Sequence, residues 1–195
     1  MKFYLEITLL PNPEVGVNFL WSKVFQQIHL GLVEIQDDQG QVPIGLSFPE
    51  YVIDDKYSVL GGKLRLFANN ETVLKQFDTV KWLARLSDYV HCTSIRLVPE
   101  KPIGYAIYQR EQPKTNPERL ARRYAKRHNI DYETALTLYS KRNYQTISSP
   151  FIRLKSLSSD NNFCLWVKKI PADIKADTTH FSRYGLSSVS TVPVF

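Results

Sequence analysis

Two hydrophobic periods alternate along the first hundred residues. Apolar positions recur every second residue in "FYLEITLL" (3–10) and every third or fourth residue in "NFLWSKVFQQIHLGL" (18–32), as in a strand and an amphipathic helix. Continued along the chain, the pattern predicts strand, helix, strand, strand, helix and strand at 3–10, 18–32, 44–51, 63–69, 70–89 and 92–99. This order is typical of the ferredoxin-like split βαβ fold, in which two helices cover one face of an antiparallel sheet.

The pattern changes after Pro99. Helices are predicted at 117–128 and 131–142, and extended segments at 105–112 and in a hairpin over 151–169. We therefore expect an α+β protein with a soft domain boundary near residue 99. A ferredoxin-like domain would span residues 1–99, and a smaller, basic α/β domain with an arginine-rich helix would span residues 100–195.

The predicted helix at 117–128 has one almost wholly basic face. Thr115, Asn116 and Pro117 are typical of a helix start, and the next residue, Glu118, is the only acid in "KTNPERLARRYAKRHN" (114–129). At 100° per residue one face collects Arg119, Arg122, Arg123, Lys126 and Arg127. Solvated faces normally mix acids with bases, so this pattern favours a polyanion partner over a merely solvated surface.

Charge is distributed unevenly over the 195 residues, whose formal net charge is +6. Residues 1–97 hold 9 basic and 11 acidic side chains, a net of −2, whereas residues 98–195 hold 16 and 8, a net of +8. Aromatic residues make up 12% of the chain. Lysine and arginine neutralise phosphates and aromatic rings stack on bases, so the second half is suited to nucleic acid.

Several other classes of protein are not indicated. No apolar run reaches the length of about 18 residues that suggests a membrane span, and the N-terminus lacks the pattern of a signal peptide. Cys92 and Cys164 stand alone, which disfavours a disulfide framework or zinc site and fits a reducing cytoplasm. Phosphate-binding loops and metal-ligand spacings are also missing, so we expect neither a metal nor a cofactor.

His29 is the histidine nearest to an apolar helical face, one turn beyond Phe25. By itself it would be interpreted as a satisfied histidine at the edge of the core. An RNA partner changes this interpretation, because RNA carries its own nucleophile, the 2′-hydroxyl. Cleavage then needs a base near pH 7, a group that holds the ribose, and donors for the developing charge. An imidazole with a pKa of about 6.5 is such a base.

Six segments in succession match one known family: "YLEITLLPNPE", "QIHLGL", "IGLSFP", "KTNPERLARRYAKRH", "PFIRLKSLSSDNNFCLWV" and "FSRYGLSS". The chain resembles the CRISPR-associated repeat-processing endoribonucleases of type I-F systems over nearly its whole length. The resemblance implies an enzyme that binds the stem-loop of CRISPR repeat RNA and cuts the precursor at the 3′ base of the stem. It also implies cleavage without a metal, a 2′,3′-cyclic phosphate product, and retention on mature crRNA with other Cas subunits of the interference complex.

The resemblance also implies catalytic roles for three residues. The histidine matching His29 deprotonates the 2′-hydroxyl, and the tyrosine matching Tyr184 orients the histidine. The serine matching Ser156 holds the ribose before the cut, and Ser158, on the same face of the strand, is the alternative. Apart from the resemblance, Tyr184 would be a packing tyrosine and Ser156 a surface serine.

RNA-binding roles follow in the same way. Residues matching Arg110 and Gln112 read base edges near the foot of the stem, and the intervening Glu111 is expected to point away from RNA. An aromatic residue matching Phe163, otherwise part of a hairpin core, stacks on the terminal base pair. The basic helix would lie along the major groove of the stem, with contacts from Lys114, Arg119, Arg122, Arg123, Lys126 and Arg127.

Two other functions remain open at this point. A non-cleaving cap subunit of the same ribonucleoprotein would need the same recognition residues and would differ only around His29. A double-stranded DNA binder could use the basic helix for recognition, but the sequence offers no preceding helix of a helix-turn-helix and no sign of a dimer.

Overall fold

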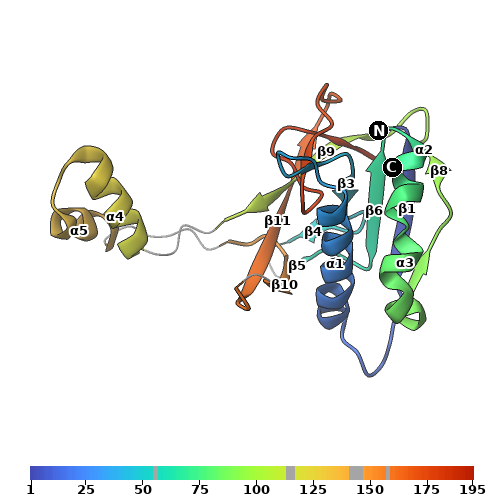
Figure 1. Cartoon of the computed structure of the whole chain (residues 1–195), viewed down its shortest axis with the longest axis horizontal. Helices are drawn as coiled ribbons and strands as arrows, with labels where there is room; N and C mark the ends of the chain where they lie inside the picture. Colours follow the sequence, from blue (N-terminus) through green and yellow to red (C-terminus); the bar gives the residue numbers. More distant parts are fainter. Residues whose placement is uncertain (55–56, 113–116, 141–146, 157–158) are drawn as a thin grey trace. The chain divides into compact units, whose positions relative to one another are not determined.

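The chain divides into two compact units (Figure 1). The first unit comprises residues 1–111 and 149–195, and the second comprises residues 112–148. The computed structural model describes residues 1–54, 57–112, 117–140, 147–156 and 159–195. The protein is a mixed α/β protein whose sheets are antiparallel.

The first sheet is built from the N-terminal segments of the chain. Its strand order is β3 (Gly45–Ser47), β6 (Lys63–Ala68), β1 (Phe3–Leu9) and β7 (Val90–Cys92), and β8 (Arg96–Leu97) also pairs with β1. The strand expected at 92–99 is therefore two short strands. The interruption begins at Thr93, where a side-chain oxygen rather than a backbone carbonyl accepts the N–H of Glu6 at 3.0 Å.

Helix α1 (Val17–Glu34) is the longest helix of this unit. It begins one residue earlier than expected, with Gly16 as its N-cap. The single helix expected at 70–89 is instead α2 (Glu71–Phe77), α3 (Thr79–Leu83) and a 3₁₀ turn (Ala84–Tyr89). Asp78 causes the break, because it adopts a left-handed conformation (φ 47°) and its side chain accepts the N–H of Lys81. No helix within the described residues is both long enough and apolar enough to cross a membrane.

The second sheet comes from the C-terminal half of the chain. Its order is β10 (Phe151–Lys155), β11 (Asn162–Ala172), β9 (Gly104–Glu111) and β13 (Val192–Val194). The hairpin expected at 151–169 and the extended segment expected at 105–112 are thus confirmed. Two ribbons complete the unit: β2 (Gln41–Val42) with β12 (Phe181–Ser182), and β4 (Val52–Ile53) with β5 (Ser58–Val59).

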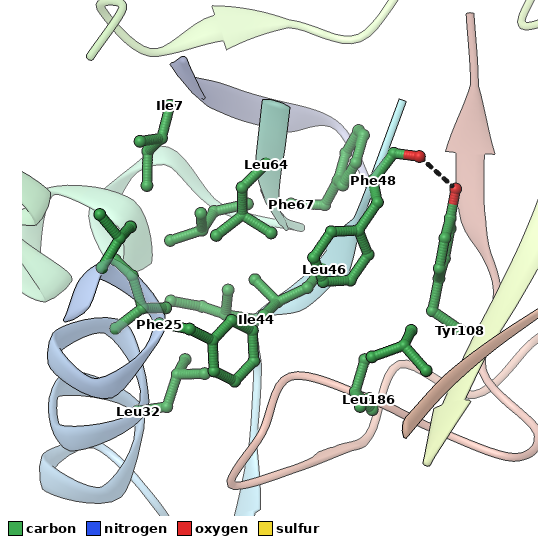
Figure 2. Packing of buried hydrophobic residues seen from close by; sticks show 14 of the residues in the cluster. Ile7, Phe25, Leu32, Ile44, Leu46, Phe48, Leu64, Phe67, Tyr108 and Leu186 are labelled. Carbon is green, nitrogen blue, oxygen red and sulfur yellow. Dashed lines mark hydrogen bonds between the residues drawn. The ribbon is translucent and has the colours of Figure 1, made fainter. Parts of the chain in front are cut away.

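One hydrophobic core joins the elements on both sides of residue 99. Figure 2 shows Phe25 and Leu32 of α1 in the same cluster as Tyr108 of β9, whose hydroxyl donates to the carbonyl of Phe48 at 3.2 Å. Burial raises the pKa of Tyr108 to about 12, so its hydroxyl stays protonated and remains a donor. The compact units thus divide the chain differently from the boundary expected near residue 99, because β9, β10 and β11 contribute to the core that β1 and α1 build.

The described part of the second unit contains two helices, α4 (Pro117–His128) and α5 (Tyr132–Ser140). Helix α4 has the bounds expected from the sequence, and α5 ends within the described residues at Ser140. The two helices pack through Ala121 and Ala135, both fully buried, and through a Tyr124–Tyr139 ring contact at 5.6 Å. The apolar face of the basic helix is therefore covered by α5.

Candidate active site and basic helix

His29 lies on α1 at the margin of its buried face, next to the fully buried Ile28. Its Nδ1 is 2.8 Å from the backbone carbonyl oxygen of Arg183, which lies 154 residues further along the chain. A carbonyl oxygen can only accept, so Nδ1 carries the hydrogen and donates it. In the neutral imidazole, Nε2 is left with a lone pair that can accept a proton.

The protonation state of His29 is set mainly by burial. Desolvation lowers the pKa of the imidazole below its ordinary value of 6.5, and the charge of Arg183 acts in the same direction. The hydrogen bond to the Arg183 carbonyl raises the pKa, but its effect is smaller than that of desolvation. The neutral form is therefore favoured at pH 7, which is the form that a general base needs.

Tyr184 lies flat against His29, with ring centroids 4.3 Å apart and ring planes 9° apart. A tight turn after β12 holds it there: Gly185 has φ of +66° and donates its N–H to the carbonyl of Ser182 at 2.7 Å. A side chain on Gly185 would also overlap Leu46 of β3. The turn that carries Tyr184 also supplies the Arg183 carbonyl, so one loop fixes both the plane and the tautomer of His29.

Two more of the expected site residues lie beside this ring pair. The Phe163 ring of β11 meets Tyr184 edge-on, with centroids 6.4 Å apart. The Arg110 guanidinium of β9 lies over both rings, 5.5 Å from Phe163 and 5.4 Å from Tyr184. Four side chains from separate segments of the chain, His29, Arg110, Phe163 and Tyr184, thus form one cluster, which we call the histidine cluster.

Glu111 is placed apart from this cluster. The side chains of neighbouring residues in β9 diverge, and the Glu111 carboxylate accepts a hydrogen bond from the Ser149 hydroxyl at 2.6 Å. Arg110 meanwhile lies over the rings of Phe163 and Tyr184. The alternation expected for residues 110 and 111 is therefore present in the structure.

Ser156 lies at the end of β10, in the turn of the β10–β11 hairpin. Its N–H donates to the carbonyl of Asn161 at 2.9 Å, and its hydroxyl accepts from the hydroxyl of Ser159 at 2.9 Å. The N–H of the preceding residue, Lys155, is 3.4 Å from the side-chain oxygen of Gln26, one helical turn before His29 on α1. The hairpin end is thus tied to the helix that carries His29. Ser158, the alternative ribose-binding serine, lies outside the described residues.

The basic helix belongs to the second unit. All five cations of its expected polar face, Arg119, Arg122, Arg123, Lys126 and Arg127, are exposed. Glu118 forms an ion pair with Arg122, one turn further along the helix, at 3.7 Å. Gln112, at the start of this unit, is also exposed, whereas Lys114 lies outside the described residues. The face remains strongly positive in the folded protein.

In the part of the chain that the structure describes, no group of three or more histidine, cysteine, aspartate or glutamate side chains is placed to hold a metal ion. Cys92 and Cys164 are free thiols. The titratable side chain that the geometry best prepares for proton transfer is thus His29.

The contact that orients His29 could not be predicted from the sequence. The Arg183 group that holds His29 is a backbone carbonyl, which every residue possesses, so no residue type could have revealed it. A role for Tyr184 in orienting His29 was expected from the resemblance alone, whereas neither the stacking of the two rings nor the placement of Arg110 over Phe163 and Tyr184 was expected.

A mixed α/β protein with an exposed arginine-rich helix, and with a histidine held in one tautomer among aromatic rings, has the features of a protein that acts on a polyanion. The chain belongs to the family described as CRISPR-associated protein (Cas_Csy4), whose model matches residues 4–195. Family membership confirms the resemblance found in the sequence.

Two relatives are similar to this chain over its entire length. Proteins named CRISPR-associated endonuclease Cas6/Csy4 from Escherichia coli (strain UTI89 / UPEC) and Pseudomonas aeruginosa (strain UCBPP-PA14) are 33% and 35% identical, with 100% of each chain covered. A solved structure titled "An RAMP protein binding different RNA substrates" aligns over 98% of this chain and 99% of that one, at 13% identity and a TM-score of 0.37.

Proposed function

We propose that this protein is a metal-independent endoribonuclease that binds the stem-loop of CRISPR repeat RNA and cleaves precursor crRNA at the 3′ base of the stem. It leaves a 2′,3′-cyclic phosphate and stays on the mature crRNA as a subunit of the type I-F interference complex. The observation that carries the proposal is the hydrogen bond from His29 Nδ1 to the Arg183 carbonyl, which leaves Nε2 as a base.

The proposed reaction uses the RNA's own nucleophile. Nε2 of His29 takes the proton of the 2′-hydroxyl, and the 2′-oxygen attacks the adjacent phosphorus. The bond from phosphorus to the 5′-oxygen of the next nucleotide breaks, and this oxygen takes up a proton to become a hydroxyl. Tyr184 keeps the imidazole plane in place through the stacked contact at 4.3 Å, and Ser156 holds the ribose before the cut.

Recognition is proposed to involve both units. Phe163 stacks on the terminal base pair, and Arg110 and Gln112 bind base edges at the foot of the stem. The cations of α4 meet phosphates or base edges along the major groove. The major groove of A-form RNA is normally too narrow for a helix, but a short stem with an open end relaxes this limit, so a hairpin is a better target than a long duplex.

We also propose that the first sheet and its helices form a ferredoxin-like βαββαβ arrangement. The antiparallel order β3-β6-β1-β7 supports it, as does the position of α1 between β1 and β3 in the sequence. The arrangement would present the C-terminal part of α1, with His29, beside the second sheet.

Cleavage is expected to proceed in excess EDTA and to stop when the nucleotide before the cut carries a 2′-deoxyribose. The reason is that the 2′-hydroxyl, and not a metal-bound water, is the nucleophile. The measurement is gel analysis of the host's repeat RNA and its 2′-deoxy counterpart, with end-group analysis for the cyclic phosphate. A requirement for Mg²⁺, or cleavage of the 2′-deoxy RNA, would contradict the mechanism. Tight binding of both RNAs without any cleavage would identify a cap subunit instead.

The pH dependence of cleavage follows from the lowered pKa of His29. The base is active when neutral, so kcat/KM is expected to stay level through neutral pH and to decline only as pH falls below the ordinary imidazole value of 6.5. The profile of kcat/KM reports the free enzyme, whose imidazole is not yet beside a phosphate. A decline that begins above pH 7 would mean that the imidazole is charged at neutral pH and would oppose this role for His29.

A further inference from the structure

An open groove lies between α1 and the β10–β11 hairpin, within the first unit. The helix packs directly against β10, and both are labelled in Figure 1. The groove is lined by Phe19, Lys23 and Gln26 from α1 and by Arg153, Lys155 and Phe163 from the hairpin, among other residues. None of them has a role in the resemblance except Phe163.

The groove is continuous with the histidine cluster. Phe163 lines the groove and also contacts Tyr184. Gln26 lines it three residues before His29, and a hydrogen bond from the Lys155 N–H to the Gln26 side chain joins the helix to the hairpin. The groove therefore begins where the scissile phosphate is proposed to lie.

The helix gives the groove a direction. Phe19, Gln26 and His29 lie within roughly 80° of one another around α1, because they are spaced by seven and three residues. His29 is ten positions after Phe19, which corresponds to about 15 Å along the helix axis. A strand leaving the histidine would thus run along the groove toward the N-terminal end of α1.

The side chains that line the groove suit single-stranded RNA. Phe19 is 56% exposed, an unusual position for a phenylalanine, and the Lys23 ammonium lies 5.1 Å from the centre of its ring. Lys23 and Arg153 form no ion pair with any described residue, whereas Lys155 is paired with Asp160 at 2.7 Å. Arg153 lies near the ring of Phe151, 5.9 Å from its centre, and also lines the groove. Proteins bind single strands with exposed aromatic rings that stack on bases and with cations in the same groove that neutralise phosphates.

We propose that this groove binds the single-stranded RNA immediately 3′ of the cut, with Phe19 stacking on a base and Lys23 and Arg153 contacting phosphates. The proposal rests on the proposed endoribonuclease function. RNA beyond the scissile phosphate must leave the site on the side away from the stem, and this groove reaches Gln26 and Phe163, which lie close to His29 and Tyr184 respectively. The protein would therefore bind precursor RNA more tightly than mature product, because the precursor fills the groove and the product, which ends at the stem, does not.

The test uses two RNAs with the same stem-loop and a 2′-deoxy nucleotide before the cut, so that neither is cleaved. One ends one nucleotide after the cut, and the other continues for several nucleotides in the 3′ direction. Dissociation constants are measured for the wild type, Phe19→Ala and the double variant Lys23→Ala/Arg153→Ala. Lys101→Ala, which removes an exposed cation elsewhere, is the matched control.

The wild type is expected to bind the flanked RNA roughly tenfold more tightly than the short one, and Phe19→Ala to abolish most of that difference. The double variant should also bind the two RNAs with similar affinity, and its affinity for the short RNA should equal that of the wild type. Lys101→Ala should change neither affinity. Equal affinity of the wild type for both RNAs would overturn the proposal, as would equal weakening of both RNAs by the variants. In either case tight binding of the short RNA would leave the proposed function intact, whereas failure of the wild type to bind any stem-loop would reject that function.

Discussion

Replacing His29 with alanine is expected to slow cleavage of the repeat RNA by roughly 10²- to 10⁴-fold, the usual contribution of a general base, with RNA affinity nearly unchanged. The side chain is half-buried beside Tyr184. Its proposed contribution is the Nε2 lone pair, while the proposed phosphate contacts come from other residues. Single-turnover cleavage rates and dissociation constants for the 2′-deoxy RNA measure the two effects separately.

Two controls separate loss of the base from damage to the fold. His91→Ala removes an exposed histidine from β7 and should cleave at the wild-type rate. Added imidazole should restore part of the activity of His29→Ala, because a small base can enter the space that the side chain vacates. Wild-type cleavage by His29→Ala would remove the histidine from the mechanism, and a parallel loss of binding would assign it a structural role.

Removing three charges from α4 together is expected to weaken RNA binding on the order of 10²-fold at moderate ionic strength. The triple variant Arg123→Ala/Lys126→Ala/Arg127→Ala deletes exposed cations that are proposed to meet phosphates. Each lost phosphate contact should reduce the slope of log affinity against log salt by about one, so the slope should flatten by about three. Titration of the 2′-deoxy stem-loop at several salt concentrations gives both quantities.

A matched triple variant tests whether position or total charge matters. Lys75→Ala/Lys81→Ala/Lys101→Ala removes the same net charge from exposed positions in the first unit. It should leave the salt slope close to that of the wild type. If both triple variants flatten the slope equally, α4 contributes only to the overall field of the protein; if neither does, its cations do not touch the RNA.

Local periodicity predicted most of the elements because it reports which face of a segment is buried. The alternation in "FYLEITLL" matches the buried Leu5, Ile7 and Leu9 of β1, and the helical repeat after it matches Leu20, Val24 and Ile28 of α1. Helix α4 has the expected bounds because proline at its first position and a continuous polar face are both local signals.

Breaks within a predicted helix were harder to recognise from the sequence. The apolar repeat across residues 70–89 continues through Asp78, so it predicts one helix where the chain forms two and a 3₁₀ turn. A capping aspartate and a surface aspartate look alike in sequence, and the left-handed conformation is decided by how the flanking turns pack. Gly31 illustrates that packing: a methyl group there would lie 2.7 Å from the rings of both Phe77 and Trp82.

The sequence by itself determined most of the strands and helices, the concentration of positive charge in α4, and membership of the family. Only the tertiary structure decided that one core joins both halves of the chain, and that His29, Arg110, Phe163 and Tyr184 meet. It also decided which imidazole nitrogen is available, through a carbonyl 154 residues away. The physical reason is that periodicity records burial within a segment, whereas contacts between distant segments depend on strand order and on the path of the loops that join them.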